Sequence, residues 1–175
     1  MNESQAAAWS EPLRLDQIGK GVVRRISASE ESRRRIAAEL DLASLDRLDA
    51  EVEVRPFGDS WEVSGRLSAA AEQTCGVTLE PLPVEIDARF AVRVVAEAPP
   101  VEDGPPVEFG LDSEDPPDVA EDRVIDLAAY VVEHLALELD PFPRKPGVEF
   151  EPPAGEAEPS PFAVLAKLRR DKADD

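Results

Sequence analysis

The chain has 175 residues, among which 19 Lys and Arg face 38 Asp and Glu, so that its formal net charge is −19. Its one Cys and one His exclude an intramolecular disulfide and a structural zinc site of the common kind, and no apolar run approaches the ~20 residues of a membrane span. The acidity argues against general nucleic-acid binding, because phosphates attract Lys and Arg. The N-terminus lacks the pattern of a secretory signal, so we expect a cytoplasmic protein.

The first predicted element is a helix over residues 29–40. Ser27 and Glu30 have the spacing of a capping box, and Ile36 and Leu40 share one helical face. Two ion pairs at i,i+4 spacing fit the same helix, Glu30–Arg34 and Glu31–Arg35. The run Arg33–Arg35 therefore has two interpretations, a phosphate-binding site or a solvated helix face with internal ion pairs, and we favour the second.

Three alternating segments then predict strands. Apolar residues occupy every second position over 48–54, 61–71 and 84–94, which is the pattern of half-buried strands. Residues 57–60 (FGDS) read as a hairpin turn between the first two segments, and residues 81–83 (PLP) are expected to break the chain before the third. The three segments favour an antiparallel sheet with one apolar face.

An acidic stretch follows at 97–122, with ten carboxylates, six prolines and no Lys or Arg. We interpret it as a long solvated loop, with an interaction tract as the alternative. Helical spacing returns after Asp126, a good N-cap, and Pro141 is expected to end that helix. Residues 148–160 read as a linker, and 161–172 as a short helix with basic residues near its end.

The fold prediction is a single α+β domain over 1–147, in which an antiparallel, curled or barrel-like sheet is packed by helices and the acidic loop lies within the domain. No catalytic motif is present, and we expect no cofactor and no metal. His134 and Cys75 are interpreted as packing residues rather than as a catalytic pair. A carboxylate cluster that binds Mg²⁺ stays open on sequence alone.

Four blocks of sequence resemble, in order and spacing, the YceD family of large ribosomal RNA subunit accumulation proteins, and most of all its alphaproteobacterial branch. The blocks are residues 10–18 (SEPLRLDQI), 73–81 (QTCGVTLEP), 125–147 (beginning IDL and ending LALELDPFPRKPG) and 161–168 (PFAVLAKL). Within the second block, the positions of the family motif are Gln73, Cys75, Thr78, Leu79, Glu80 and Pro81. Many members carry Cys-x-x-Cys where this chain has residues 72–75 (EQTC), so a zinc role cannot rest on its own cysteines.

The resemblance implies a non-enzymatic cytoplasmic factor for the accumulation of large-subunit rRNA. Its partner would be a basic large-subunit ribosomal protein or a pre-ribosomal particle, to which the net charge of −19 also points. Two alternatives remain, a metal-dependent enzyme acting on rRNA precursors and direct rRNA contact through a local basic patch. The residues that such a patch would use for partner binding are Arg14, Arg24, Arg25, Arg33, Arg34, Arg35, Arg144 and Lys145.

Overall fold

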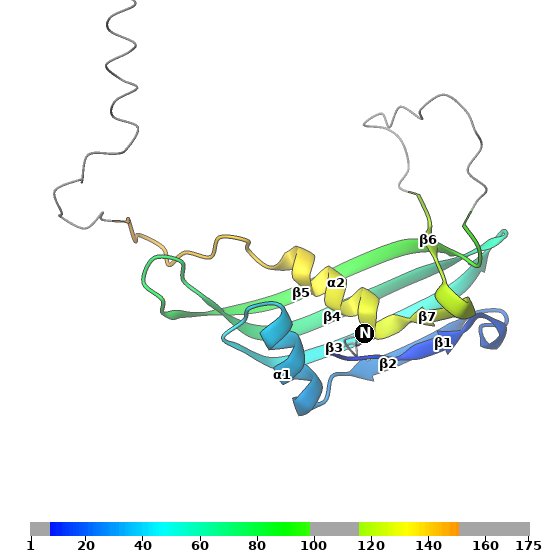
Figure 1. Ribbon diagram of the computed structural model, residues 1–175, viewed down its shortest axis with the longest axis horizontal. Coiled ribbons are helices and arrows are strands. Elements are labelled where there is room, and N and C mark those ends of the chain that lie inside the picture. Colours follow the sequence, from blue (N-terminus) through cyan, green and yellow to red (C-terminus); the bar gives the residue numbers. More distant parts are fainter. Residues whose placement is uncertain (1–7, 99–115, 151–175) are drawn as a thin grey trace, which may run out of the picture.

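A computed structural model describes residues 8–98 and 116–150 of the chain (Figure 1). In chain order its elements are β1 (Pro12–Arg14), η1 (Leu15–Gln17), β2 (Val22–Ser27), α1 (Glu30–Glu39), β3 (Ser44–Phe57), β4 (Ser60–Thr74), β5 (Pro81–Val95), β6 (Asp118–Val119), η2 (Glu121–Arg123), β7 (Val124–Asp126) and α2 (Leu127–Glu138). None of the helices in these two ranges is both long enough and apolar enough to cross a membrane.

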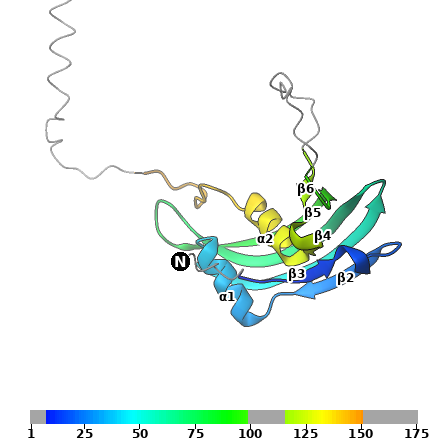
Figure 2. The same cartoon turned by 45° about the vertical axis from the view of Figure 1, so that its right-hand side comes forward.

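The main feature is a five-stranded sheet in the order β2-β3-β4-β5-β6, and β1 pairs separately with β7. All neighbouring strands run antiparallel except β5 and β6, which are parallel. The long strands are visibly bent (Figure 2). The α+β prediction is confirmed. The barrel-like alternative is wrong for the described strands, because β2 and β6 lie at opposite ends of the sheet and do not pair.

The three predicted strands are confirmed as β3, β4 and β5. The alternating apolar side chains point to one face and form the core, with Val52, Val54, Val63 and Leu67 completely buried. The hairpin turn is also confirmed, since Phe57 pairs with Ser60 around a two-residue loop. Gly58 has a φ of 60° there, a conformation that favours glycine at the first position of such a loop.

Gly65 of β4 leaves room for the ring of Phe90, its partner on β5, to lie over it. The two residues are paired in the register of β4 with β5, and a Cβ on Gly65 would lie only 2.7 Å from the Phe90 ring. Phe90 therefore occupies the space that a side chain at position 65 would fill. Its ring stacks on His134 of α2 with 4.4 Å between the ring centroids, and this contact helps to seat the helix on the apolar face.

Two of the three predicted helices fall on described residues, and both are present as α1 and α2. The N-cap of α1 is Ser29 and not Ser27, whose hydroxyl donates instead to the Asp49 carboxylate of β3 over 2.6 Å. The capping-box interpretation is therefore wrong, because β2 extends to Ser27 and uses its side chain across strands. The expected ion pair between Glu30 and Arg34 is present. In α2, Asp126 is the predicted N-cap and accepts from the Ala128 N–H over 3.1 Å.

Sequence patterns missed β1, β2 and β7 and misplaced the start of β5. β2 has only one buried residue, Ile26, and carries Arg24 and Arg25, so its alternation is too weak to recognise. The segment 81–83 begins β5 instead of interrupting the chain. Proline lacks an N–H, but at Pro81 and Pro83 the backbone N–H would point away from β4, so no hydrogen bond to β4 is lost.

Several predictions fall on residues outside the described ranges. The predicted loop 97–122 lies mostly in 99–115, and only its end is described, where β6 and η2 form. The predicted linker at 148–160 and helix at 161–172 lie almost wholly in residues 151–175, which are also outside the described part of the chain.

Candidate functional site

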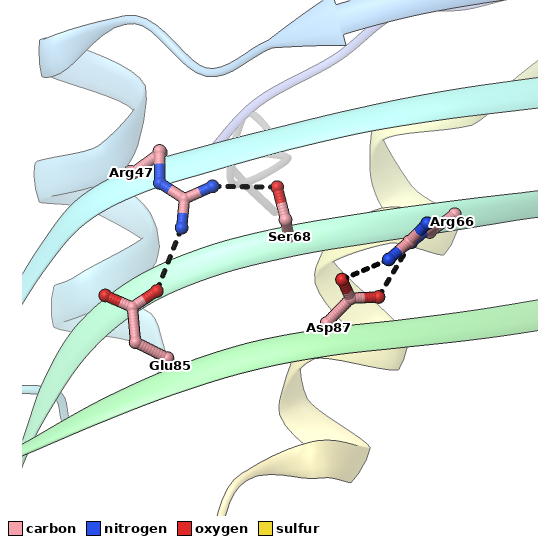
Figure 3. Close-up of polar contacts among 5 residues, drawn as sticks. All are labelled: Arg47, Arg66, Ser68, Glu85 and Asp87. Atoms are coloured by element: carbon pink, nitrogen blue, oxygen red, sulfur yellow. Dashed lines mark hydrogen bonds and ion pairs between the residues drawn. The ribbon is translucent and has the colours of Figure 1, made fainter.

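The face of the sheet that points away from both helices carries a row of charged and hydroxyl side chains, which we call the polar sheet face (Figure 3). A shallow hollow of about 840 Å³ lies on it. Its polar lining comes from four neighbouring strands and consists of Arg25, Ser27, Arg47, Asp49, Glu51, Arg66, Ser68, Glu85 and Asp87. Three guanidinium groups thus face four carboxylates, which makes the hollow a charge mosaic and not a basic surface.

The strand register sets the partners on this face. Arg66 of β4 binds Asp87 of β5 through two hydrogen bonds of 2.8 and 2.5 Å. Arg47 of β3 reaches across β4, where the small Ala70 stands opposite it, and donates to Ser68 and to Glu85 over 2.9 Å each. Arg47 and Arg66 are therefore already bound to carboxylates, and an RNA phosphate would have to displace those partners.

The Arg66–Asp87 pair shifts the ionisation of both groups. The hydrogen bonds from Arg66 lower the pKa of Asp87 below its usual value, and the Asp87 carboxylate raises the pKa of Arg66. Both groups are therefore charged at neutral pH. Both side chains are more than half exposed, so solvent screening limits what the pair contributes to stability.

The eight residues proposed for a basic patch lie on four separate parts of the chain: β1, β2, α1 and the segment after α2. Several already have partners. Arg14 pairs with Asp16 over 3.3 Å and Arg25 with Glu51 over 2.5 Å, while Arg34 pairs with Glu30. Arg33 donates to the Ala28 carbonyl over 2.8 Å, and Arg24 to the Val23 carbonyl over 3.4 Å. Only Arg25 of the eight lines the hollow on the polar sheet face.

The family-motif residues form a second feature, the turn of residues 75–80 between β4 and β5, which we call the Cys75 turn. Cys75 is completely buried, and its Sγ accepts from the N–H groups of Thr78 and Lys145 at 3.5 and 3.4 Å. The Gly76 N–H donates to the Pro143 carbonyl over 2.9 Å. The second and third blocks of the sequence are therefore packed against each other.

Side chains strengthen the same junction. The Lys145 ammonium donates to Glu80 over 2.9 Å, and the Gln73 amide donates to the Asp140 carbonyl over the same distance. The ion pair lowers the pKa of Glu80 and raises that of Lys145. Since Lys145 is held by Glu80, its charge is largely compensated by its neighbour.

Hydrogen bonds to Cys75 also change its acidity. The Thr78 side chain and the N–H groups around Sγ lower the pKa of this thiol to about 6, against the opposing effect of burial. Close to it in the turn, Leu79 has a φ of 60° and is 77% exposed. Leu79 and Phe142 are among the exposed large apolar residues of the described chain, and both belong to this junction.

His134 packs between α2 and the sheet. Its Nδ1 lies 2.8 Å from the Tyr130 carbonyl, so this nitrogen carries the proton, and the ring stacks on Phe90. The hydrogen-bond partners of Cys75 come from its own turn and from the segment after α2, and His134 is not one of those described. Within the described ranges, no group of three or more His, Cys, Asp and Glu side chains is placed to hold a metal ion.

Two smaller hollows share an acidic boundary beside β6. One of about 450 Å³ lies between the end of β5, Pro116 and α2, and the other, of about 380 Å³, lies between β6, β7 and α2. Asp118 and Glu133 line both of them. Asp118 accepts from the Tyr130 hydroxyl over 3.0 Å, and burial together with this carboxylate raises the pKa of Tyr130. This boundary thus brings two exposed carboxylates close together on the described surface.

Sequence reasoning did not single out the pairs on the polar sheet face or the boundary beside β6. The outward positions of the alternating strands were the available signal for Arg47, Arg66, Glu85 and Asp87. Asp118 and Glu133 gave no such signal, because 15 residues separate them and only the packing of α2 beside β6 brings them to the same hollows.

Comparison with known proteins gives one finding. The family model described as "Large ribosomal RNA subunit accumulation protein YceD" matches residues 63–169, which include most of β4 and all of β5, the Cys75 turn and α2. No curated protein and no solved structure matches the chain.

Proposed function

The chain belongs to the YceD family, and from this membership we propose that it is a non-enzymatic factor that supports the accumulation of large-subunit ribosomal RNA by binding a basic ribosomal protein or a pre-ribosomal particle. The description of the family supports a role in the accumulation of the large ribosomal RNA subunit. The choice of partner and the mode of binding are our proposal, and they rest on the charge of the molecule.

The proposal rests mainly on one observation, that several Arg and Lys side chains of the described surface are already paired with carboxylates. On the polar sheet face Arg25, Arg47 and Arg66 each bind a carboxylate, and at the Cys75 turn Lys145 binds Glu80. The chain as a whole keeps a net charge of −19. Such a surface attracts a cationic protein and repels a polyphosphate, so long-range electrostatics favour a basic partner.

The acidic boundary beside β6 is our candidate for the surface that a basic partner would contact. Asp118 and Glu133 are exposed and lie next to apolar lining residues, among them Val119 and Ala129. A Lys or Arg side chain has an apolar stem and a cationic end, so it matches that combination of surfaces. Direct rRNA contact is less well supported, because Arg25 and Arg34 would have to exchange their carboxylate partners for phosphates.

The test is a pull-down with the tagged full chain at low and at high salt, followed by identification of the bound proteins and RNA. We expect a basic large-subunit protein at low salt and much less of it at high salt, because screening weakens contacts between exposed charges. Binding that does not change with salt would overturn the charge-based mechanism. Recovery of rRNA without protein would favour the direct-contact alternative.

A further inference from the structure

One edge of the main sheet is open along most of a strand. β5 pairs with β4 over almost its entire length, from Pro81 to Val94, but on its other side it pairs with β6 only at Val94 and Val95. No other described strand pairs with β5 between residues 81 and 92. In Figure 1, β5 forms the margin of the sheet opposite β2.

The backbone orientation along this edge follows from a single hydrogen bond. The Ala120 N–H donates to the Val95 carbonyl over 2.8 Å, so the polar groups of residue 95 point away from β4. Backbone groups alternate in direction along a strand, and the β4–β5 register is continuous. The odd-numbered residues of β5 therefore direct their N–H and C=O groups outward.

The prolines of β5 agree with this assignment. Pro81 and Pro83 are both odd-numbered, and a proline is tolerated in a strand where its missing N–H would face outward. Beyond them, Glu85, Asp87, Arg89 and Ala91 have exposed side chains and outward backbone groups. The open edge that can form a ladder with another strand thus runs from Glu85 to Ala91.

The open edge ends at a hollow whose charged lining is three carboxylates and one arginine. The hollow of about 450 Å³ is lined by Ala91, Val92 and Arg93 of β5 and by three carboxylates, Glu62, Asp118 and Glu133. Glu62 already binds Arg55 over 2.7 Å. Asp118 and Glu133 belong to β6 and α2, which flank the strand end, so a cation reaching the end of the edge meets two carboxylates.

We propose that the β5 edge binds an extended segment of a basic protein as an added strand, with a Lys or Arg side chain of that segment in the acidic hollow at the end of the edge. Main-chain hydrogen bonds to an exposed edge supply affinity in this mode of recognition, and side-chain pockets supply selectivity. A second copy of this chain fits less well, because two molecules of charge −19 repel each other. The choice of a basic partner rests on the proposed function.

The experiment compares three forms of the full chain: wild type, Ala91→Pro and Ala91→Ser. Proline at position 91 removes an outward N–H and leaves the ladder to β4 intact, as Pro81 and Pro83 do, whereas serine keeps the N–H and the small size. Each immobilised form is incubated with the basic proteins extracted by salt from purified large ribosomal subunits. We expect Ala91→Pro to retain about tenfold less protein than wild type, and Ala91→Ser to retain the same amount.

Hydrogen–deuterium exchange of wild type gives a second measurement that does not depend on the folding of any variant. The outward amides of Glu85, Asp87 and Arg89 should become protected when the extracted proteins bind. Two outcomes would show that the partner does not bind the β5 edge as an added strand: undiminished retention by folded Ala91→Pro, or outward amides that stay unprotected in the complex. In either case the proposed function would still stand, because the protein would bind a basic partner elsewhere. If wild type retains none of the proteins, or retains only rRNA, the proposed function fails and the basic partner with it.

Discussion

The backbone N–H of Lys145 donates a hydrogen bond of 3.4 Å to the Sγ of Cys75, although 70 residues separate the two in the chain. This bond joins the turn between β4 and β5 to the segment that follows α2. Because the sulfur also accepts from Thr78, the thiolate form of Cys75 is stabilised in the folded protein.

The first prediction concerns the pH dependence of stability. The pKa of Cys75 is about 6 in the fold, and a thiol in an unfolded chain has a pKa of about 8.5. Between these values the unfolded state binds more protons, so this thiol should make the free energy of unfolding rise with pH, and its contribution should be lost as the pH falls through 6. Urea unfolding of wild type and Cys75→Ser across this range measures the difference.

Cys75→Ser is the matched variant, because serine keeps a hydrogen-bond acceptor and does not ionise in this range. We expect its free energy of unfolding to rise less steeply with pH than that of wild type. Identical slopes for the two proteins would show that the thiol ionises similarly in the folded and unfolded states.

The second prediction concerns Asp126, which joins the N-terminal segment to the start of α2. Its carboxylate accepts from the Ala128 N–H at the start of α2, from the Glu11 N–H over 2.8 Å and from the Ser10 hydroxyl over 2.7 Å. Loss of an N-cap costs about 1 kcal/mol, and the two further bonds add to this. We therefore expect Asp126→Ala to lower the free energy of unfolding by about 2 kcal/mol in urea titrations.

A control for this variant lies on the same helix. Glu138→Ala removes an exposed carboxylate from the last turn of α2 and should change stability by less than about 0.5 kcal/mol. Equal losses for the two variants would contradict the role of Asp126 as the link between the N-terminal segment and α2.

The third prediction tests the contact of Gly65 with Phe90. A Cβ at position 65 would lie 2.7 Å from the Phe90 ring and 3.0 Å from the Glu51 carbonyl, so the ring has to move. Overpacking of this kind costs about 1–3 kcal/mol. We expect Gly65→Ala to be destabilised by that amount, as measured by thermal or urea unfolding.

Gly76→Ala provides the comparison, because its Cβ would meet only the Pro143 carbonyl at 3.8 Å, an ordinary contact. In the double variant Gly65→Ala/Phe90→Leu, the smaller side chain at position 90 should recover part of the loss. Additive effects of the two substitutions would argue that Phe90 does not determine the need for glycine.

The sequence predicts the elements that depend on neighbouring residues, and it does not predict those that depend on contacts between distant parts of the chain. β3, β4 and β5 were predictable because the alternation of Val52, Val63 and Ile86 with polar neighbours is a local signal. β2 was not predicted because arginine occupies two of its six positions. β1 and β7 were not predicted because they have only three residues each. Such short strands form only because they pair with each other across the molecule.

The candidate site was predictable only in part for the same reason. The family motif pointed to Cys75 and Glu80, but their contact with Lys145 depends on how the segment after α2 returns to the sheet. The basic residues were visible as a group in the sequence, and their partners were not. The pairing of Arg66 with Asp87, for example, depends on the register between β4 and β5.

The last prediction concerns the two carboxylates beside β6. Asp118 and Glu133 line both acidic hollows, and their exposed positions let them attract a cationic segment before contact is made. In Asp118→Asn/Glu133→Gln, the asparagine can still accept from the Tyr130 hydroxyl, so packing should be preserved. We expect weaker binding of the basic large-subunit proteins at low salt and a smaller loss of binding as salt is added, since fewer charges remain to be screened. The matched control is Glu138→Gln/Glu149→Gln, which also removes two exposed charges, lies outside both hollows and should leave the salt dependence nearly unchanged. If Asp118→Asn/Glu133→Gln and this control have the same salt dependence, the attraction comes from the overall charge of the chain and not from the boundary beside β6.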